Sequence, residues 1–189
     1  MRKPHQPVLS CAVGENALAI KSVPRLPTLT TGIRGRRLNS ADDLTDEQRQ
    51  IKYRICGEDA AKLAKQFTKL RLTYPRMTLP EGIVFILLKA MRVEFVYQVD
   101  AYGGRVIRGG QVPDFMVPNL SMVIRVQGDY WHSRPEQRVR DEIDKIALYS
   151  AEINGQRVKF VIDIWESQLL SCERKQIVEM ALNGQEVSI

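Results

Sequence analysis

The chain has 189 residues and a mass of 21.6 kDa, the size of one globular domain with an extension. Hydrophobic residues make up 44% and charged residues 26%, which excludes a collagen-like repeat, a wholly disordered chain and a small disulfide scaffold. No apolar run approaches the roughly 18 residues that a membrane span needs. We therefore expect a chain that mostly folds and has no membrane partner.

Positive charge is concentrated at the N-terminus. Residues 1–40 hold seven Lys/Arg and one acid, so the whole formal net charge of +6 lies there, together with four of the nine prolines. A basic arm of this kind predicts an anionic partner such as DNA, because each Lys or Arg placed near a phosphate releases counterions. Two alternatives are a solvated tail without a specific role and an arm that binds a protein partner. The predicted DNA contacts in the arm are Arg34, Arg36 and Arg37.

The cysteines Cys11, Cys56 and Cys172 lie far apart and form no C-x-x-C pair. This spacing predicts no structural zinc, and the odd number indicates a reducing compartment. We expect a cytoplasmic protein.

Helical patterns begin at residue 45. Thr45 and Gln48 predict a capping box, and Gly57 is expected to break the following helical segment in two. A second helix is predicted from Thr78, whose capping partner is Glu81, through a long apolar run. The chain divides into a basic Pro-containing extension (1–44), a helical segment (45–77), an α/β core (78–170) and a C-terminal helix and tail (171–189).

Strands are predicted at 93–99, 114–117, 122–127 and 158–165, with a helix at about 134–151 before the last one. That helix carries an apolar face, which we expect to pack on the sheet. Its members are Val139, Ile143, Ile146 and Ala147. A helical crossover before the last strand implies a parallel pair, so the fold class is α/β, with a mixed central sheet flanked by helices.

Four sequence elements of the core occur in a recognisable order. They are the acid Glu81 on the first core helix, the run Pro113-Asp114-Phe115, the run Gly128-Asp129-Tyr130-Trp131-His132 and the pair Trp165-Glu166. This set resembles the very-short-patch-repair endonuclease branch of the PD-(D/E)XK nuclease superfamily over residues 78–170. The resemblance implies a restriction-endonuclease-like core and metal-dependent hydrolysis of DNA.

The resemblance also implies a role for each matched residue. Asp114 becomes the central ligand of Mg²⁺ or Mn²⁺, and Glu81 the helix-borne acid that completes the metal site, because hard cations prefer carboxylate oxygens. Gln127 takes the position of the superfamily lysine, and His132 that of a base or phosphate contact. The further predicted nucleic-acid contacts are Arg125 and Trp131.

Each assignment has a structural alternative. Glu81 completes the helix cap at Thr78, Asp114 follows a proline where a turn residue is common, and His132 packs beside its tryptophan neighbour. The cysteines of the repair enzymes that bind zinc, and their aromatic wedge, are not recognisable here. Mismatch specificity is therefore not transferred.

The acid-x-Lys step of the superfamily falls on Arg125-Val126-Gln127, so a cation replaces the acid and an amide replaces the lysine. Two functions follow. The first is a metal-dependent endonuclease or nickase, encoded by a phage or mobile element, in the host cytoplasm or associated with a virion, as a monomer or a homo-oligomer. The second is a nuclease-fold protein that has lost catalysis and binds nucleic acid or protein. The direction of Arg125 separates them, and Arg125 must share a face with Gln127.

Overall fold

The structure is a computed structural model that describes residues 44–106, 108–130 and 135–186. All of the described residues belong to one compact unit. The predicted basic arm, with Arg34, Arg36 and Arg37, lies outside the described residues.

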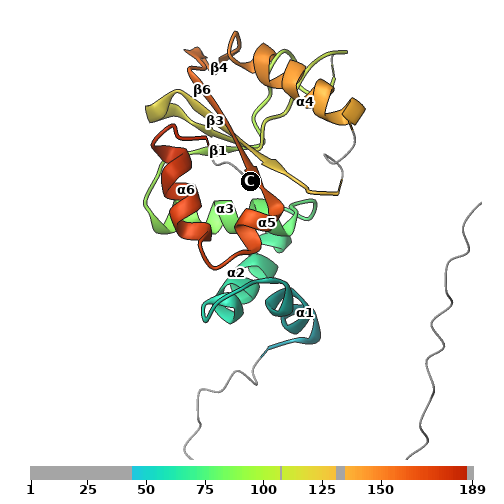
Figure 1. Ribbon diagram of the computed structural model, residues 1–189, viewed down its shortest axis with the longest axis vertical. Coiled ribbons are helices and arrows are strands. Elements are labelled where there is room, and N and C mark those ends of the chain that lie inside the picture. Colours follow the sequence, from blue (N-terminus) through green and yellow to red (C-terminus); the bar gives the residue numbers. More distant parts are fainter. Residues whose placement is uncertain (1–43, 107, 131–134, 187–189) are drawn as a thin grey trace, which may run out of the picture. The chain divides into compact units, whose positions relative to one another are not determined.

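Along the described chain, three helices come first, short strands follow with one helix between them, and two helices come last (Figure 1). The helices are α1 (Asp46–Arg54), α2 (Ala60–Thr73), α3 (Leu79–Ala90), α4 (Pro135–Leu148), α5 (Glu166–Leu170) and α6 (Arg174–Leu182), with a 3₁₀ turn, η1 (Pro118–Leu120). The strands are β1 (Val96–Tyr97), β2 (Phe115–Val117), β3 (Met122–Gln127), β4 (Glu152–Ile153), β5 (Gln156–Arg157) and β6 (Phe160–Trp165).

The predicted helix starts are confirmed by their caps. The Thr45 hydroxyl accepts a hydrogen bond from the Gln48 backbone N–H, and the Gln48 side chain accepts one from the Thr45 N–H. Thr78 caps α3 in the same position, since its hydroxyl accepts from the Glu81 N–H. Gly57 separates α1 from α2 with a φ of +96°, a conformation that favours glycine.

One mixed sheet with the order β1-β2-β3-β6 forms the centre of the fold. The first three strands are antiparallel neighbours, and β6 returns through α4 to pair in parallel with β3. This confirms the predicted α/β class and the predicted joining of four strands into one sheet. A separate two-stranded ribbon, β4-β5, lies in the crossover.

The first strand is shorter than predicted. Residues 93–99 were expected to be extended, but β1 contains two residues. The backbone at Arg92 and Gln98 has φ values of 59° and 52°. Because extended strands need negative φ, these two residues confine the strand to the stretch between them.

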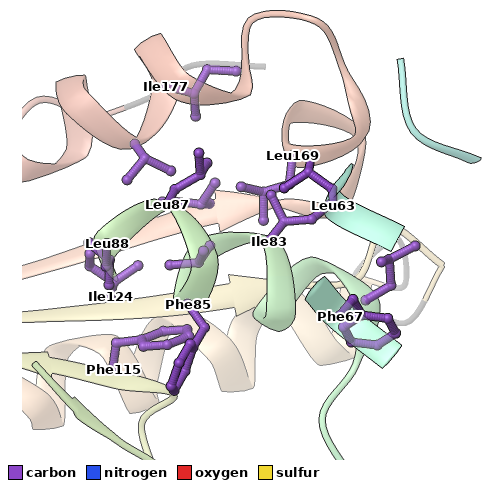
Figure 2. Close-up of a cluster of buried hydrophobic side chains, with 14 of the residues drawn as sticks. Leu63, Phe67, Ile83, Phe85, Leu87, Leu88, Phe115, Ile124, Leu169 and Ile177 are labelled. Atoms are coloured by element: carbon purple, nitrogen blue, oxygen red, sulfur yellow. The ribbon is translucent and has the colours of Figure 1, made fainter. Parts of the chain in front are cut away.

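The larger core lies between α3 and one face of the sheet (Figure 2). Ile83, Leu87 and Leu88 of α3 share a buried cluster with Phe115 of β2 and Ile124 of β3, and α5 and α6 close it. Helix α2 approaches α3 closely, since a Cβ added at Gly82 would lie 2.2 Å from the Phe67 ring. This packing anchors the helical segment to the core.

Helix α4 covers the opposite face of the sheet (Figure 1). The face that α4 turns toward the sheet differs from the predicted one. The predicted core face points outward, with Val139, Ile143 and Ile146 each about 60% exposed. The sheet side of α4 instead presents partly buried polar side chains and Leu148. The reason is that this face of the sheet carries charged side chains near the end of β3, which polar partners stabilise better than apolar ones.

A disulfide joins Cys56 to Cys172 across 116 residues of sequence. The spacing of the cysteines gave no reason to expect this pair. Along the described residues, no helix has the length and apolar character of a membrane span.

Candidate functional site

A pocket of about 260 Å³ opens beside α4, where β2 begins and β3 ends. Asp114, Arg125 and Gln127 line it from the strands, and Asp144 lines it from the helix. Phe115 pairs with Ile124, so Asp114 and Arg125 follow as the next antiparallel neighbours. The sequence-predicted residues of these two strands thus meet on one face, the face covered by α4.

Asp114 is the buried carboxylate of this pocket. Its Oδ2 atom accepts a 2.7 Å hydrogen bond from the Val126 N–H, which fixes the carboxylate against β3. Burial raises the pKa of Asp114 from its ordinary 3.8 to about 7; the carboxylates of Glu81 and Asp163 act in the same direction, while the Val126 bond and the Arg125 cation oppose it. The carboxyl group therefore keeps its proton to a higher pH than an ordinary aspartate does.

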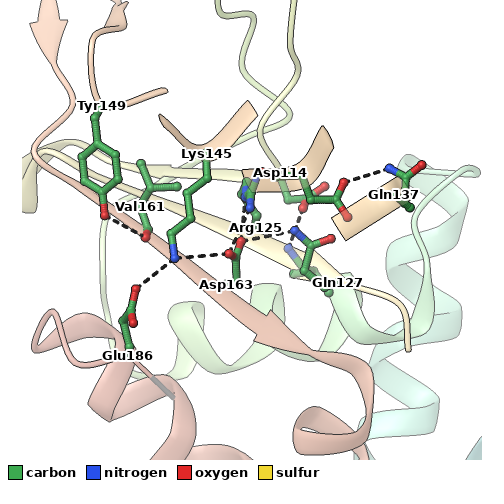
Figure 3. A network of polar contacts seen from close by, with 11 residues as sticks. Asp114, Arg125, Gln127, Gln137, Lys145, Tyr149, Val161, Asp163 and Glu186 are labelled. Atoms are coloured by element: carbon green, nitrogen blue, oxygen red, sulfur yellow. Dashed lines mark hydrogen bonds and ion pairs between the residues drawn. The ribbon is translucent and has the colours of Figure 1, made fainter. Parts of the chain in front are cut away.

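Arg125 faces the same pocket but is bound to a carboxylate on the neighbouring strand (Figure 3). Its Nε and Nη2 atoms donate to the two oxygens of Asp163 at 2.6 and 2.9 Å, and Nη1 donates to the Asp141 carbonyl of α4 at 2.9 Å. The side chains of Arg125 and Asp163 are 11% and 19% exposed. The two-point bond to Asp163 joins β3 to β6, and the bond to Asp141 joins β3 to α4.

Asp163 is the centre of a wider network. Gln127 Nε2 donates to its Oδ1 at 3.2 Å, and Lys145 Nζ lies 3.4 Å from its Oδ2 and 3.0 Å from Glu186. Burial alone would raise the pKa of Asp163, but the bonds and charges of Arg125, Gln127 and Lys145 outweigh it and lower that pKa. Two cations and one amide thus keep this carboxylate ionised, and its two oxygens are already bound within the protein.

Glu81 is positioned by the start of α3, on the other side of the sheet from α4. Its Oε1 accepts from the Thr78 hydroxyl at 2.7 Å, and its Oε2 accepts from the Tyr97 hydroxyl at 2.5 Å. Burial, followed by this bond to Glu81, raises the pKa of Tyr97, so the phenol stays a donor. Glu81 influences Asp114 electrostatically but is not among the residues that line its pocket.

The described residues do not fit the expected Mg²⁺ or Mn²⁺ site. Such a site needs carboxylate oxygens directed at one point. Here Glu81 already accepts from two hydroxyls, and Asp163 holds Arg125. The two carboxylates that line the pocket are Asp114, which lies next to a guanidinium, and Asp144, which already accepts from the Gln111 amide. Among the residues that the structure describes, no group of three His, Cys, Asp or Glu side chains is arranged to hold a metal.

Two predicted site residues, Trp131 and His132, lie outside the described residues. Gln127 is 7% exposed and directs its amide at Asp163. Arg125, predicted as a nucleic-acid contact, makes three hydrogen bonds within the protein. The roles predicted for these residues in catalysis and binding stay predictions.

Sequence analysis missed Asp163 and Lys145. The signal for Asp163 was present, because it is the single charged residue in the apolar strand β6, just as Arg125 is in β3. Lone charges of opposite sign in two buried strands indicate a pair when the strands are neighbours. In the parallel register Arg125 lies directly beside Asp163.

Three comparisons with known proteins were made, and none of them identifies a similar protein. A scan against models of protein families finds no match, and searches of curated proteins and of solved structures find none either.

Proposed function

We propose that this chain is a non-catalytic member of the PD-(D/E)XK nuclease superfamily that binds nucleic acid without cleaving it. The observation that carries this proposal is the position of Arg125. It stands where the superfamily motif has an acid, lines the same pocket as Asp114 and is held there by Asp163.

Electrostatics explains why this arrangement opposes metal catalysis. A divalent cation at Asp114 would lie beside the fixed positive charge of Arg125, and like charges repel strongly where little water screens them. A nuclease needs the cation to neutralise charge on the phosphate and to activate water. In place of that metal ion the pocket holds the guanidinium of Arg125, which is fixed by Asp163 and cannot coordinate and activate a water molecule.

The proposed partner is nucleic acid because the chain's excess positive charge lies in one segment. Residues 1–40 carry the net charge of +6, and the remaining residues are neutral overall. Binding that depends on this segment is expected to weaken steeply as salt rises, since counterion release is its main driving force.

The proposal is tested on the full chain with labelled single-stranded, duplex and branched DNA. We expect binding in EDTA and no cleavage above background in Mg²⁺ or Mn²⁺. Replacing Arg34, Arg36 and Arg37 together by Gln is expected to lower the slope of log K against log salt by about 3, roughly 0.9 per lost phosphate contact. The control is Arg71→Gln, which removes an exposed cation paired with Glu47. Unchanged binding in the triple variant would remove the arm from this proposal.

A second candidate function, a metal-dependent endonuclease or nickase, is favoured by one observation. Asp114 Oδ2 is fixed by Val126, and its Oδ1 makes no hydrogen bond to a described residue at the pocket, as a metal-ligating oxygen would require. If the wild-type chain cleaves DNA and Asp114→Asn abolishes cleavage while retaining the fold, this function is correct and the non-catalytic proposal is wrong. Gln127→Lys is then expected to raise the cleavage rate.

An exchange of charges distinguishes the two candidates further. Arg125→Glu combined with Asp163→Lys reverses the pair without breaking it and places an acid beside Asp114, as in the superfamily motif. If Arg125 is what excludes the metal, this double variant gains a Mn²⁺ site that the wild type lacks. Arg125→Gln with Asp163→Asn serves as the neutral control, for which no gain is expected.

A further inference from the structure

The strongest unassigned feature of the molecule is the junction between its first two helices and its last two. Cys56 lies in the connection from α1 to α2, and Cys172 lies in the connection from α5 to α6, where the two are bonded. Both cysteines are exposed. Exposed disulfides are the ones that small thiols and disulfides reach, so this bond is accessible to exchange.

The two connections are also held together without the sulfur atoms. Arg174 is 3% exposed, and its guanidinium donates to the Leu169 carbonyl at 3.2 Å, to Asp59 at 2.8 Å and to the Cys56 carbonyl. The Cys56 N–H in turn donates to the Leu170 carbonyl at 2.8 Å. The bonds to Asp59 and Cys56, and the bond from Cys56 to Leu170, join the first connection to the helices that flank the second. The bond to Leu169 joins those two helices to each other.

Gly57, the residue next to Cys56, allows the two connections to lie close together. Gly57 has a φ of +96°, and a Cβ there would lie 3.3 Å from an Asp59 oxygen and 3.7 Å from the Cys172 sulfur. A side chain at this position would be strained and would crowd the junction.

We infer that Cys56 and Cys172 form a reversible disulfide site whose two thiols are kept adjacent by Arg174. In the forward direction, the two thiols react with one low-molecular-weight disulfide such as oxidised glutathione. A thiolate attacks it, a mixed disulfide forms, and the second cysteine displaces the remaining glutathione. One protein disulfide and two molecules of reduced glutathione result, the protein having lost two protons and two electrons.

Arg174 makes this reaction efficient because it holds the reduced state in nearly the geometry of the oxidised one. The second step is then intramolecular, with an effective concentration set by how well the two connections are fixed. Oxidation closes the chain between residues that are 116 apart and fastens α1 to the C-terminal helices. The inference is independent of the proposed nucleic-acid function.

The experiment uses the full chain with Cys11→Ser, so that two thiols remain. The protein is equilibrated with reduced and oxidised glutathione at several ratios, quenched with an alkylating reagent, and analysed by peptide mass spectrometry. We expect one species lighter by two hydrogen atoms, with residues 56 and 172 linked. The absence of this link at every glutathione ratio, or linkage only between molecules, would overturn the inference.

Two variants test the role assigned to Arg174. Arg174→Gln is expected to lower the effective concentration of the thiols about tenfold or more, since a charged group loses several hydrogen bonds. If that variant does not fold, Asp59→Asn decides, because the Asp59 side chain is half exposed and loses only its charge. The control Lys175→Gln removes a neighbouring exposed cation paired with Glu179 and should leave the effective concentration of the thiols unchanged. An unchanged effective concentration in both Asp59→Asn and Arg174→Gln would contradict the role of Arg174.

Discussion

Arg125 and Asp163 form a pair in which each residue satisfies a charge that would otherwise be costly to bury. Their side chains are mostly hidden, and Lys145 is the second cation at Asp163, with a side chain that is 12% exposed. A partly buried pair of this kind need not make the protein more stable than an apolar pair would. Removing one partner is nevertheless expensive, because it leaves the other charge uncompensated.

This asymmetry gives a stability prediction. Asp163→Leu should lower the free energy of unfolding by about 3 kcal/mol, and adding Arg125→Met should restore most of the loss. Urea denaturation of the wild type, both single variants and the double variant measures the coupling. The exposed pair of Arg71 and Glu47 is the control, with an expected coupling below about 1 kcal/mol. Additive losses at positions 125 and 163 would show that the pair is not coupled.

Asp114 gives a prediction for pH. Its pKa is about 7 in the folded chain and near 3.8 when unfolded, so between these pH values the folded state holds a proton that the unfolded state has lost. The free energy of unfolding should therefore fall as pH rises from about 4 to 7, by about 1.4 kcal/mol per pH unit from this group, and should not change further above 7.

Asp114→Asn removes this contribution while retaining an oxygen that accepts from the Val126 N–H. The difference in unfolding free energy between variant and wild type is expected to shift steadily in favour of the variant from pH 4 to 7. Denaturant titrations at several pH values measure it. A difference that is constant with pH would mean that Asp114 has an ordinary pKa.

At the scale of the elements, α4 is an amphipathic helix whose polar side faces the sheet. Gln137, Asp141 and Lys145 lie on that side, and Gln137 donates to the Asp141 side chain at 2.8 Å. The helix completes the enclosure of Arg125 and Asp163 with a backbone carbonyl and an ammonium group. Its apolar side is exposed along Val139, Ile143 and Ile146.

The orientation of α4 is tested by one substitution. Ile143→Gln should change the free energy of unfolding by no more than about 0.5 kcal/mol, as expected of an exposed position. A matched substitution in the buried face of α3, Ile83→Gln, should cost several kcal/mol, because Ile83 is fully buried. A large loss for Ile143→Gln, measured by urea denaturation, would mean that this side of α4 is covered.

The elements show what a sequence can predict and what it cannot. The bounds of β3, the capped starts of α1 and α3 and the break at Gly57 follow from local chemistry, and all were predicted. The direction of α4 was not, because periodicity says which residues share a face and not which face meets the sheet. That choice depends on Arg125 and Asp163, whose pairing requires the register of two strands joined by a long crossover.

The same limit applies to the candidate site. The shared face of Arg125 and Gln127 follows from strand alternation and is confirmed by their common partner Asp163. The partner itself lies 38 residues from Arg125 along the chain, and no local rule connects the two positions. The sequence thus identified the residues of β2 and β3 that meet, but not the third strand that determines what they can do.

At the scale of the whole molecule, the described residues form a mixed sheet with α3, α5 and α6 on one face and α4 on the other. A helix, three antiparallel strands, a crossover helix and a parallel strand follow one another along the chain. Under the proposed function, the central pocket holds a network of paired charges where a nuclease would hold a metal ion.

The most direct test of this account is a calorimetric titration of Mg²⁺, and separately of Mn²⁺, into the wild-type chain and into Asp114→Asn. The titration is performed at pH 8, above the pKa of Asp114 of about 7, so that protonation does not mask a site. We predict the same heats for both proteins at metal concentrations up to the millimolar range. The reason is that Asp163 is already paired with Arg125, so this second carboxylate is not free to join Asp114 in binding a cation. A saturable site in the wild type that disappears in Asp114→Asn would contradict it.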